Sequence, residues 1–208
     1  MNDKMYWLQT PEKWFSVKSA LFNPVRFFLV QRDKKVMELL QESKWDSLCD
    51  IGCGSGDYLT SFVNKEKIIG IDYSEKMLSL AKKNKPQNFH LCCANATQIP
   101  IKDKAVDAVV AIGLIDYLEH IEPFLIECSR IAKHTIIFTA PSTYSPFFIL
   151  RVSPFLFFRK YFLSIPKIDK SYTKTEITYL LNKHSIKPKE IFKFFGTLWF
   201  VIGVKDEY

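Results

Sequence analysis

Residues 48–56, Leu48-Cys49-Asp50-Ile51-Gly52-Cys53-Gly54-Ser55-Gly56, decide the fold of this chain. The stretch opens with a short apolar run typical of a buried strand, and three glycines at alternate positions follow. Glycine allows backbone angles and a close approach of a ligand that a Cβ atom would block. A helix that starts after such a loop offers unpaired N–H groups to the same ligand. The stretch therefore predicts a strand, a ligand-binding loop and a helix, in that order.

A second motif, Gly70-Ile71-Asp72-Tyr73-Ser74, places a carboxylate at the end of the next predicted strand. Asp72 follows Gly52 by 20 residues. A carboxylate at that place can accept hydrogen bonds from both ribose hydroxyls of an adenosine. Alone, Asp72 is equally typical of a turn before a helix that Ser74 caps. Beside the glycine loop, the adenosine interpretation is favoured.

The spacing of the glycines argues against a dinucleotide. A dinucleotide-binding loop needs the pattern G-x-G-x-x-G, whereas the third glycine here is one position early, at Gly56. Asp57 then stands where a pyrophosphate would dock on the start of the helix. A nicotinamide- or flavin-dependent dehydrogenase is therefore disfavoured.

The rest of the chain alternates apolar strand patterns with helical ones, which is typical of a mostly parallel sheet with helices on both faces. We expect an α/β, Rossmann-like sheet of seven strands, with a C-terminal antiparallel hairpin that turns at Gly196-Thr197. The expected strands are Ser47–Ile51, Lys67–Ile71, Phe89–Cys93, Ala105–Ile112, Thr135–Ala140, Ile186–Phe195 and Thr197–Val204. The expected helices after the glycine loop are Asp57–Asn64, Ser74–Lys83, Leu118–Ile131 and Thr175–Lys183.

The 208 residues are expected to form one domain with four parts. Residues 1–44 form a helical cap, within which Asn23-Pro24 is a helix start signal, and residues 45–141 form the core that binds the cofactor. Residues 142–172 form an aromatic and basic lid, and residues 173–208 form the C-terminal helix and hairpin.

The two motifs together resemble a known family. LCDIGCGSGDY at residues 48–58, followed by GIDYSEKML at residues 70–78, is similar to the first two signature motifs of class I S-adenosylmethionine (SAM)-dependent methyltransferases. The resemblance extends from Trp45 to Pro141 and implies SAM as the cofactor and methyl transfer as the activity.

The resemblance also implies which residues bind the cofactor. Gly52, Cys53 and Gly54 would border its methionine portion, and Asp50 would lie near its ammonium group. Asp72 would hold the ribose, and Tyr73 and Met77 would flank the adenine. A third motif, Ala94–Ile101, matches less closely. The Asp that usually holds the adenine amino group is Asn95 here, whose amide oxygen can accept the same hydrogen bond. Ala96 and Ile112 would complete the pocket wall.

The segment Ala111–His120 narrows the choice of methyl acceptor. It lacks the Asn/Asp-Pro-Pro-Tyr/Phe motif of enzymes that methylate exocyclic amino groups or glutamine, and it lacks the Pro-Cys of pyrimidine C5 enzymes. Nucleic acid is thereby disfavoured as a partner, and a small-molecule substrate is expected. A looser resemblance of Leu114–Pro141 and the lid to magnesium-protoporphyrin O-methyltransferases favours methylation at oxygen.

Three residues of that segment, Asp116, Tyr117 and His120, lie where the family places side chains that face the substrate. His120 is the expected general base, because the unperturbed pKa of histidine is about 6.5. Two structural interpretations stay open. His120 could be a partly exposed residue at a helix start, and Asp116 could be a helix cap.

The net charge of +7 is unevenly distributed. Residues 1–150 hold eighteen Lys/Arg and seventeen Asp/Glu, whereas residues 151–208 hold eleven and five. An anionic substrate, a membrane surface, RNA or a merely solvated Lys-rich surface could each explain this excess. The aromatic and basic residues 144–165 are expected to form a lid over a hydrophobic or anionic substrate, with a peripheral membrane contact as a further option and a self-packing subdomain as the alternative.

The five cysteines form no Cys-x-x-Cys pair, so no metal site is expected. We see no secretory signal and no spanning apolar run, and we expect a cytoplasmic protein. Two alternative functions stay open: an RNA methyltransferase that uses the basic C-terminal segment, and a non-catalytic protein that binds the cofactor.

Overall fold

A computed structural model of the protein describes residues 24–62, 64–84, 88–143 and 170–205. The expected lid at 144–165 and the chain before Pro24 lie outside these described residues. The division of the chain into cap, core, lid and C-terminal part stays a prediction.

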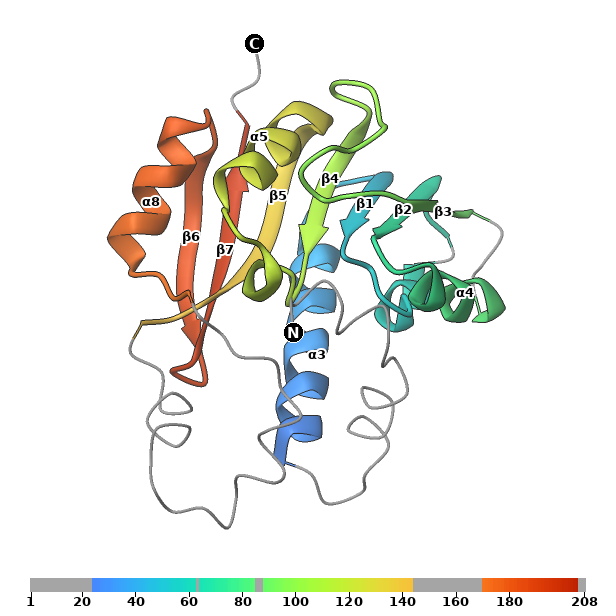
Figure 1. The fold of residues 1–208 in the computed structure, drawn as a ribbon, viewed down its shortest axis with the longest axis horizontal. Helices are drawn as coiled ribbons and strands as arrows, with labels where there is room; N and C mark the ends of the chain where they lie inside the picture. The colour runs from blue at the N-terminus through green and yellow to red at the C-terminus, as the bar shows by residue number, and fades with distance from the viewer. Residues whose placement is uncertain (1–23, 63, 85–87, 144–169, 206–208) are drawn as a thin grey trace.

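Seven strands form one sheet in the order β3-β2-β1-β4-β5-β7-β6 (Figure 1). All neighbours are parallel except β7, which runs antiparallel to both β5 and β6. The strands are β1 (Ser47–Ile51), β2 (Lys67–Asp72), β3 (Phe89–Cys93), β4 (Val106–Ala111), β5 (Ala132–Pro141), β6 (Lys187–Phe194) and β7 (Leu198–Val204). The predicted fold class, including the C-terminal hairpin, is confirmed.

The strand order fixes where a ligand can bind. From β1 the chain moves outward to β2 and β3 and then returns to β4 on the other side of β1. Helices that follow β1 and β4 therefore diverge, and a crevice opens at the carboxyl ends of these two strands. The glycine loop, which directly follows β1, lies in that crevice.

Alternate residues of the central strands pack on opposite faces of the sheet. In β4, Val109 belongs to a core on one face, and Ala108 and Val110 belong to a core on the other. The first core includes α5 (Glu122–Ile131) and α8 (Lys174–Lys183). The second includes α3 (Pro24–Glu42) and η1 (Asp57–Phe62), and α4 (Glu75–Asn84) packs beside β3. Helices thus cover both faces (Figure 1).

Three predicted local structures differ from the observed ones. The helix after the glycine loop is the short 3₁₀ helix η1. The helix predicted from Leu118 begins only at Glu122, because Leu118 itself has extended backbone angles and ends a separate 3₁₀ turn, η2 (Ile115–Tyr117). The hairpin turns at Phe195-Gly196, one residue earlier than predicted, since these two residues carry φ angles of 47° and 68°.

Among the described residues, none of the helices combines the length and the apolar character needed to span a lipid bilayer.

Candidate cofactor site

The glycine loop is held against the end of β2. The backbone N–H groups of Gly52 and Cys53 both donate to the carbonyl of Ile71, at 2.7 and 2.9 Å. Gly52 has a φ of 75°, and a Cβ atom there would lie 3.0 Å from the Leu114 side chain. Backbone conformation and lack of space therefore both require glycine at this position.

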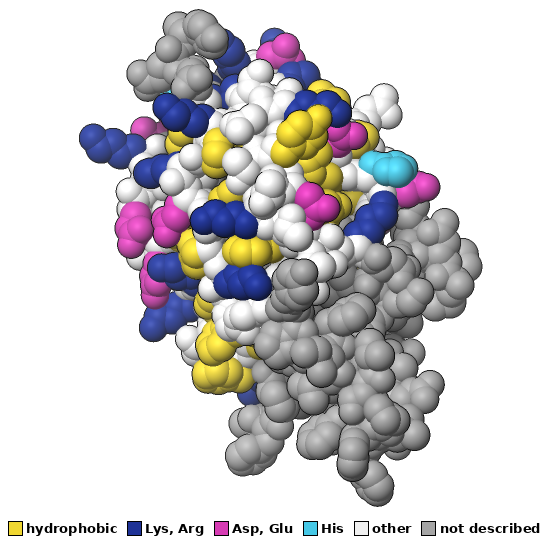
Figure 2. All heavy atoms as spheres, turned by 90° about the vertical axis from the view of Figure 1, so that its left-hand side faces the viewer, with side chains coloured by type: hydrophobic (Ala, Val, Ile, Leu, Met, Phe, Trp, Pro, Cys, Tyr) yellow, Lys and Arg dark blue, Asp and Glu magenta, His cyan; other side chains and the backbone are white. Residues whose placement is uncertain are grey.

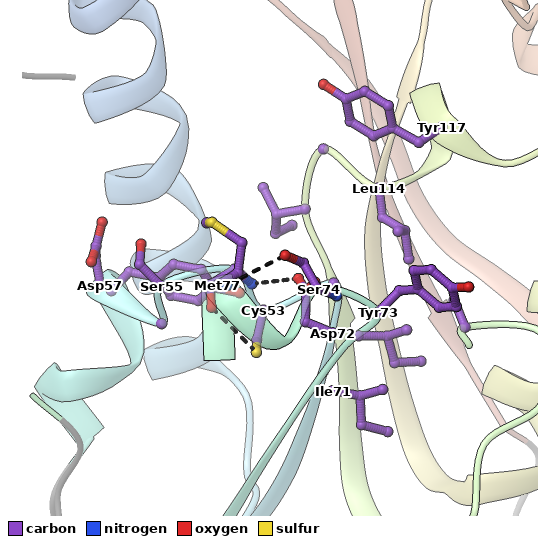
Figure 3. Close-up of a pocket in the computed structure, with 18 of the residues that line it drawn as sticks. Cys53, Ser55, Asp57, Ile71, Asp72, Tyr73, Ser74, Met77, Leu114 and Tyr117 are labelled. Carbon is purple, nitrogen blue, oxygen red and sulfur yellow. Dashed lines mark hydrogen bonds between the residues drawn. The ribbon is translucent and has the colours of Figure 1, made fainter. Parts of the chain in front are cut away.

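Asp72 joins the loop to the chain after β2. One carboxylate oxygen accepts from the Gly54 N–H at 2.9 Å, and the other accepts from the Ser74 N–H at 2.8 Å (Figure 3). Burial raises the pKa of Asp72, and these two hydrogen bonds oppose the shift. Each carboxylate oxygen keeps a further lone pair for a ligand.

A cavity opens beside this carboxylate, at the carboxyl ends of β1, β2 and β4 (Figure 3). Its lining brings together most of the residues that the sequence predicted to bind the cofactor, namely Gly52, Cys53, Gly54, Asp72, Tyr73, Met77, Asn95, Ala96 and Ile112. Tyr117 also lines this cavity. Asp50, Asp116 and His120 are not among the lining residues, and His120 is exposed to solvent.

Tyr73 and Met77 differ in how they are held. Tyr73 is exposed, whereas Met77 is buried, and the hydroxyl of Ser74 accepts a hydrogen bond from the Met77 N–H at 3.4 Å. The amide oxygen of Asn95 accepts from the Thr97 N–H at 3.1 Å. That bond fixes the orientation of the Asn95 side chain and leaves the second lone pair of its oxygen for a ligand.

Asp50 is a buried carboxyl group in β1, two residues before Gly52. Neither of its oxygens has a hydrogen-bond partner among the described residues. Burial raises the pKa of Asp50 to about 8. The Tyr58 hydroxyl and Arg32 oppose this shift, and the charges of Asp72 and Asp33 add to it. An uncompensated buried carboxyl is costly, so this position favours a cationic group nearby.

Arg32 is a cleft residue that the sequence analysis assigned only to the expected N-terminal helix. It lies on α3, is only 9% exposed and lines the cavity. Its Nε and Nη2 donate to one oxygen of Asp33, at 3.0 and 2.6 Å. Its Nη1 makes no hydrogen bond with any described residue and lies 2.8 Å from the place where a Cβ atom of Gly113 would be. The one available signal was an arginine within an otherwise apolar helical stripe.

Asp116 lies within η2 and caps neither η2 nor α5, so the helix-cap interpretation is wrong. Burial raises its pKa to about 6, and the charge of Arg32 opposes the shift. Asp116 in turn contributes to the raised pKa of Tyr172. A carboxyl group that titrates near neutral pH therefore lies in η2, directly before Tyr117 of the cavity lining.

Within the described part of the chain, no group of three or more His, Cys, Asp or Glu residues is placed to hold a metal ion.

Known proteins share both this sequence core and this fold. A family profile described as "Methyltransferase domain" matches residues 49–138. A probable tRNA methyltransferase 9B from Homo sapiens is 35% identical over 85 residues, which are 40% of this chain and 18% of that protein. A demethylmenaquinone methyltransferase from Thermotoga maritima is 31% identical over 104 residues, 48% of this chain and 44% of that protein. The chain thus spans less than half the length of these curated relatives.

Among solved structures, the magnesium protoporphyrin IX methyltransferase from Synechocystis with bound SAH has a TM-score of 0.75 at 16% identity, over 99% of this chain and 100% of that one. Residues 49–138 therefore match a methyltransferase domain, and the fold of the chain is that of a solved SAH-bound methyltransferase. Both findings support SAM as the cofactor.

The cleft fits that cofactor. SAM combines an adenosine with an amino acid that carries an ammonium and a carboxylate. The backbone of the glycine loop lines the cavity, and the carboxylate of Asp72, which holds the Gly54 N–H, lines it as well. Asp50 supplies a buried carboxyl group, and Arg32, which pairs with Asp33 through Nε and Nη2, has its Nη1 left for a ligand. The individual contacts of these residues with SAM stay predictions.

Proposed function

We propose that this methyltransferase transfers the methyl group of SAM to a small hydrophobic or anionic molecule, most simply at an oxygen atom. SAM supplies an electrophilic methyl group when it is bound, so the protein mainly has to orient and desolvate the acceptor. The observation that carries the proposal is the cleft at the carboxyl ends of β1 and β4, which gathers most of the predicted cofactor residues. Asp116, whose pKa is raised by burial to about 6, directly precedes Tyr117, which lines the cleft.

In this proposal, Arg32 and Asp50 hold the amino-acid end of SAM. The free Nη1 of Arg32 would pair with the carboxylate, and the buried Asp50 would stabilise the ammonium group through the field at the site. Arg32→Gln should then weaken binding of S-adenosylhomocysteine by about 10- to 100-fold. An analogue without the carboxylate should bind both forms equally in calorimetry. An equal loss for both ligands would show that Arg32 acts on the fold and not on the carboxylate.

Asp116 is the described carboxyl group that best suits a general base, because with a pKa near 6 it is ionised at neutral pH and still able to take up a proton. His120 and Tyr117 stay candidates from the sequence. Of the three, Tyr117 alone lines the cavity; His120 is exposed to solvent, whereas Asp116 is partly buried.

Support for a small acceptor comes from the relatives' names, which include a demethylmenaquinone methyltransferase and a magnesium protoporphyrin IX methyltransferase. Both names describe acceptors that contain an apolar ring system. The absence of the Asn/Asp-Pro-Pro-Tyr/Phe motif in Ala111–His120 points the same way.

The test is transfer of a tritiated methyl group from SAM into separated lipid, aqueous small-molecule, RNA and protein fractions, with Asp72→Ala as the inactive control. We expect label in the lipid or small-molecule fraction, and we expect Asp116→Asn to reduce the rate while leaving cofactor affinity unchanged. Label confined to RNA or protein, or no label above the Asp72→Ala control, would refute the proposal.

RNA methylation is the second candidate. It is favoured by the relatives named as probable tRNA methyltransferases and by the excess of basic residues in 151–208. RNA binding of this kind would weaken steeply as salt is raised, because it releases counterions. A non-catalytic role would leave every fraction of the tritium experiment unlabelled.

A further inference from the structure

The turn between β6 and β7 holds an aromatic residue in a conformation that suits other residues better. Phe195 and Gly196 occupy the two central positions, and the Thr197 N–H donates to the Phe194 carbonyl at 3.0 Å. Both central residues have positive φ, which favours Asn, Asp or Gly at the first position. Phe195 has a φ of 47° and is nonetheless 56% exposed, so neither backbone preference nor burial explains it.

Phe195 belongs to a larger apolar surface. Its ring centroid lies 6.3 Å from that of Phe27 and 6.0 Å from that of Phe28, both on α3. Phe27 is 60% exposed, and Val30, one helical turn further along α3, is 52% exposed. We call Phe27, Val30 and Phe195 the aromatic patch. Phe28 and Phe194 lie beneath it with ring centroids 5.6 Å apart and join it to the core.

Positive charge borders this patch. Lys34 follows Val30 by one turn on the same side of α3, is exposed and forms no ion pair with any residue that the structure describes. The acidic residues of that part of α3, Asp33 and Glu38, pair with Arg32 and Lys35. On the neighbouring edge strand β6, three lysines accompany one glutamate. Figure 2 faces this edge and shows a group of hydrophobic side chains at its lower end, with Lys and Arg side chains above it.

The patch lies at the edge of the sheet where the cleft opens. Leu198, which follows the turn, pairs with Pro141 at the carboxyl end of β5. The turn therefore lies at the same edge as the carboxyl ends of β1 and β4 (Figure 1). Arg32 extends from α3 into the cleft, while Phe27 and Val30 of the same helix face solvent.

We propose that the aromatic patch docks the methyltransferase on an anionic lipid bilayer. The carboxyl ends of β1 and β4, where the cleft opens, then face the lipid. Exposed aromatic and aliphatic side chains with a cationic border are the composition that binds such an interface. That an acceptor enters from the bilayer rests on the proposed function, whereas the docking itself does not.

The test is co-flotation of the full chain with phosphatidylcholine vesicles that contain or lack phosphatidylglycerol. Phe195→Asn should lower binding to the anionic vesicles by about tenfold, and it should raise the unfolding temperature because Asn suits the positive φ. Phe27→Ser should also reduce binding. The matched control is Tyr179→Asn on α8, which removes a 65% exposed aromatic outside the patch and should change nothing.

Three outcomes would overturn the proposal. The unaltered chain could fail to bind anionic vesicles, or Phe195→Asn could bind them as well as the unaltered chain does. Phe195→Asn could also convert an oligomer into a monomer in sedimentation, which would assign the patch to a second copy. Calorimetry with S-adenosylhomocysteine should give the same affinity for Phe195→Asn and the unaltered chain, so a failure of docking is distinguishable from a failure of the cofactor assignment.

Discussion

Asp72 has two roles. Its carboxylate is predicted to bind the ribose, and it also accepts hydrogen bonds from the Gly54 and Ser74 N–H groups. Asp72→Ala should weaken cofactor binding by a few kcal/mol through the loss of charge-assisted hydrogen bonds. Isothermal calorimetry with S-adenosylhomocysteine measures this loss, and Asp103→Ala, an exposed carboxylate outside the cleft, is the control. Unaltered affinity in Asp72→Ala would contradict the ribose assignment.

Asp50 should make the stability of the cofactor-free protein depend on pH. Its pKa is about 8 in the folded chain and near 3.8 in an ordinary aspartate. Between these values the unfolded chain releases a proton that the folded chain keeps, so stability falls as pH rises through this window. Asp50→Asn removes the effect. The unfolding temperature of Asp50→Asn minus that of the unaltered chain should therefore increase steadily from pH about 5 to about 8.

Thermal unfolding of the two proteins across this pH range provides the measurement. Parallel curves would mean that Asp50 ionises normally in the folded state. Saturating S-adenosylhomocysteine should flatten the difference, since a neighbouring ammonium group favours the ionised carboxylate.

At the scale of elements, the strands were predictable and the short connecting segments were not. β1 and β3 have the predicted bounds, and for β1 the short apolar run between Asp46 and Gly52 leaves little choice of where the strand begins and ends. The start of α5 was misplaced because Leu118 looks helical by spacing, while its extended backbone is set by the preceding 3₁₀ turn. The cleft role of Arg32 was missed because helical spacing shows that a residue is buried but not which strand end it approaches.

The helix α8 begins with a capping box that a single substitution can test. The Thr173 hydroxyl accepts from the Glu176 N–H at 3.2 Å, and the Glu176 carboxylate accepts from the Thr173 N–H at 2.7 Å. Thr173→Ala should lower the free energy of unfolding by about 1 kcal/mol. Urea denaturation measures it, with Thr175→Ala, an exposed change within the same helix, as the control. A loss no larger than that of the control would show that the cap does not stabilise α8.

For the whole molecule, ligand binding and folding are linked. A ligand that binds only the folded chain raises its stability by about 2.7 kcal/mol at a concentration of 100 times its Kd. SAM and S-adenosylhomocysteine should therefore raise the unfolding temperature, whereas NAD should leave it unchanged because Asp57 stands where its pyrophosphate would dock. Stabilisation by NAD equal to that by SAM would contradict the proposed site.

The position of β7 between β5 and β6 has a consequence for how the chain is made. During synthesis from the N-terminus, β5 and β6 emerge before the strand that joins them, so each presents an open hydrogen-bonding edge until residues 198–204 leave the ribosome. A chain stopped at Thr197 should accordingly be digested rapidly by protease within 170–197, whereas one that extends through Val204 should resist. Folding of the newly made sheet would then be complete only after β7 has been synthesised.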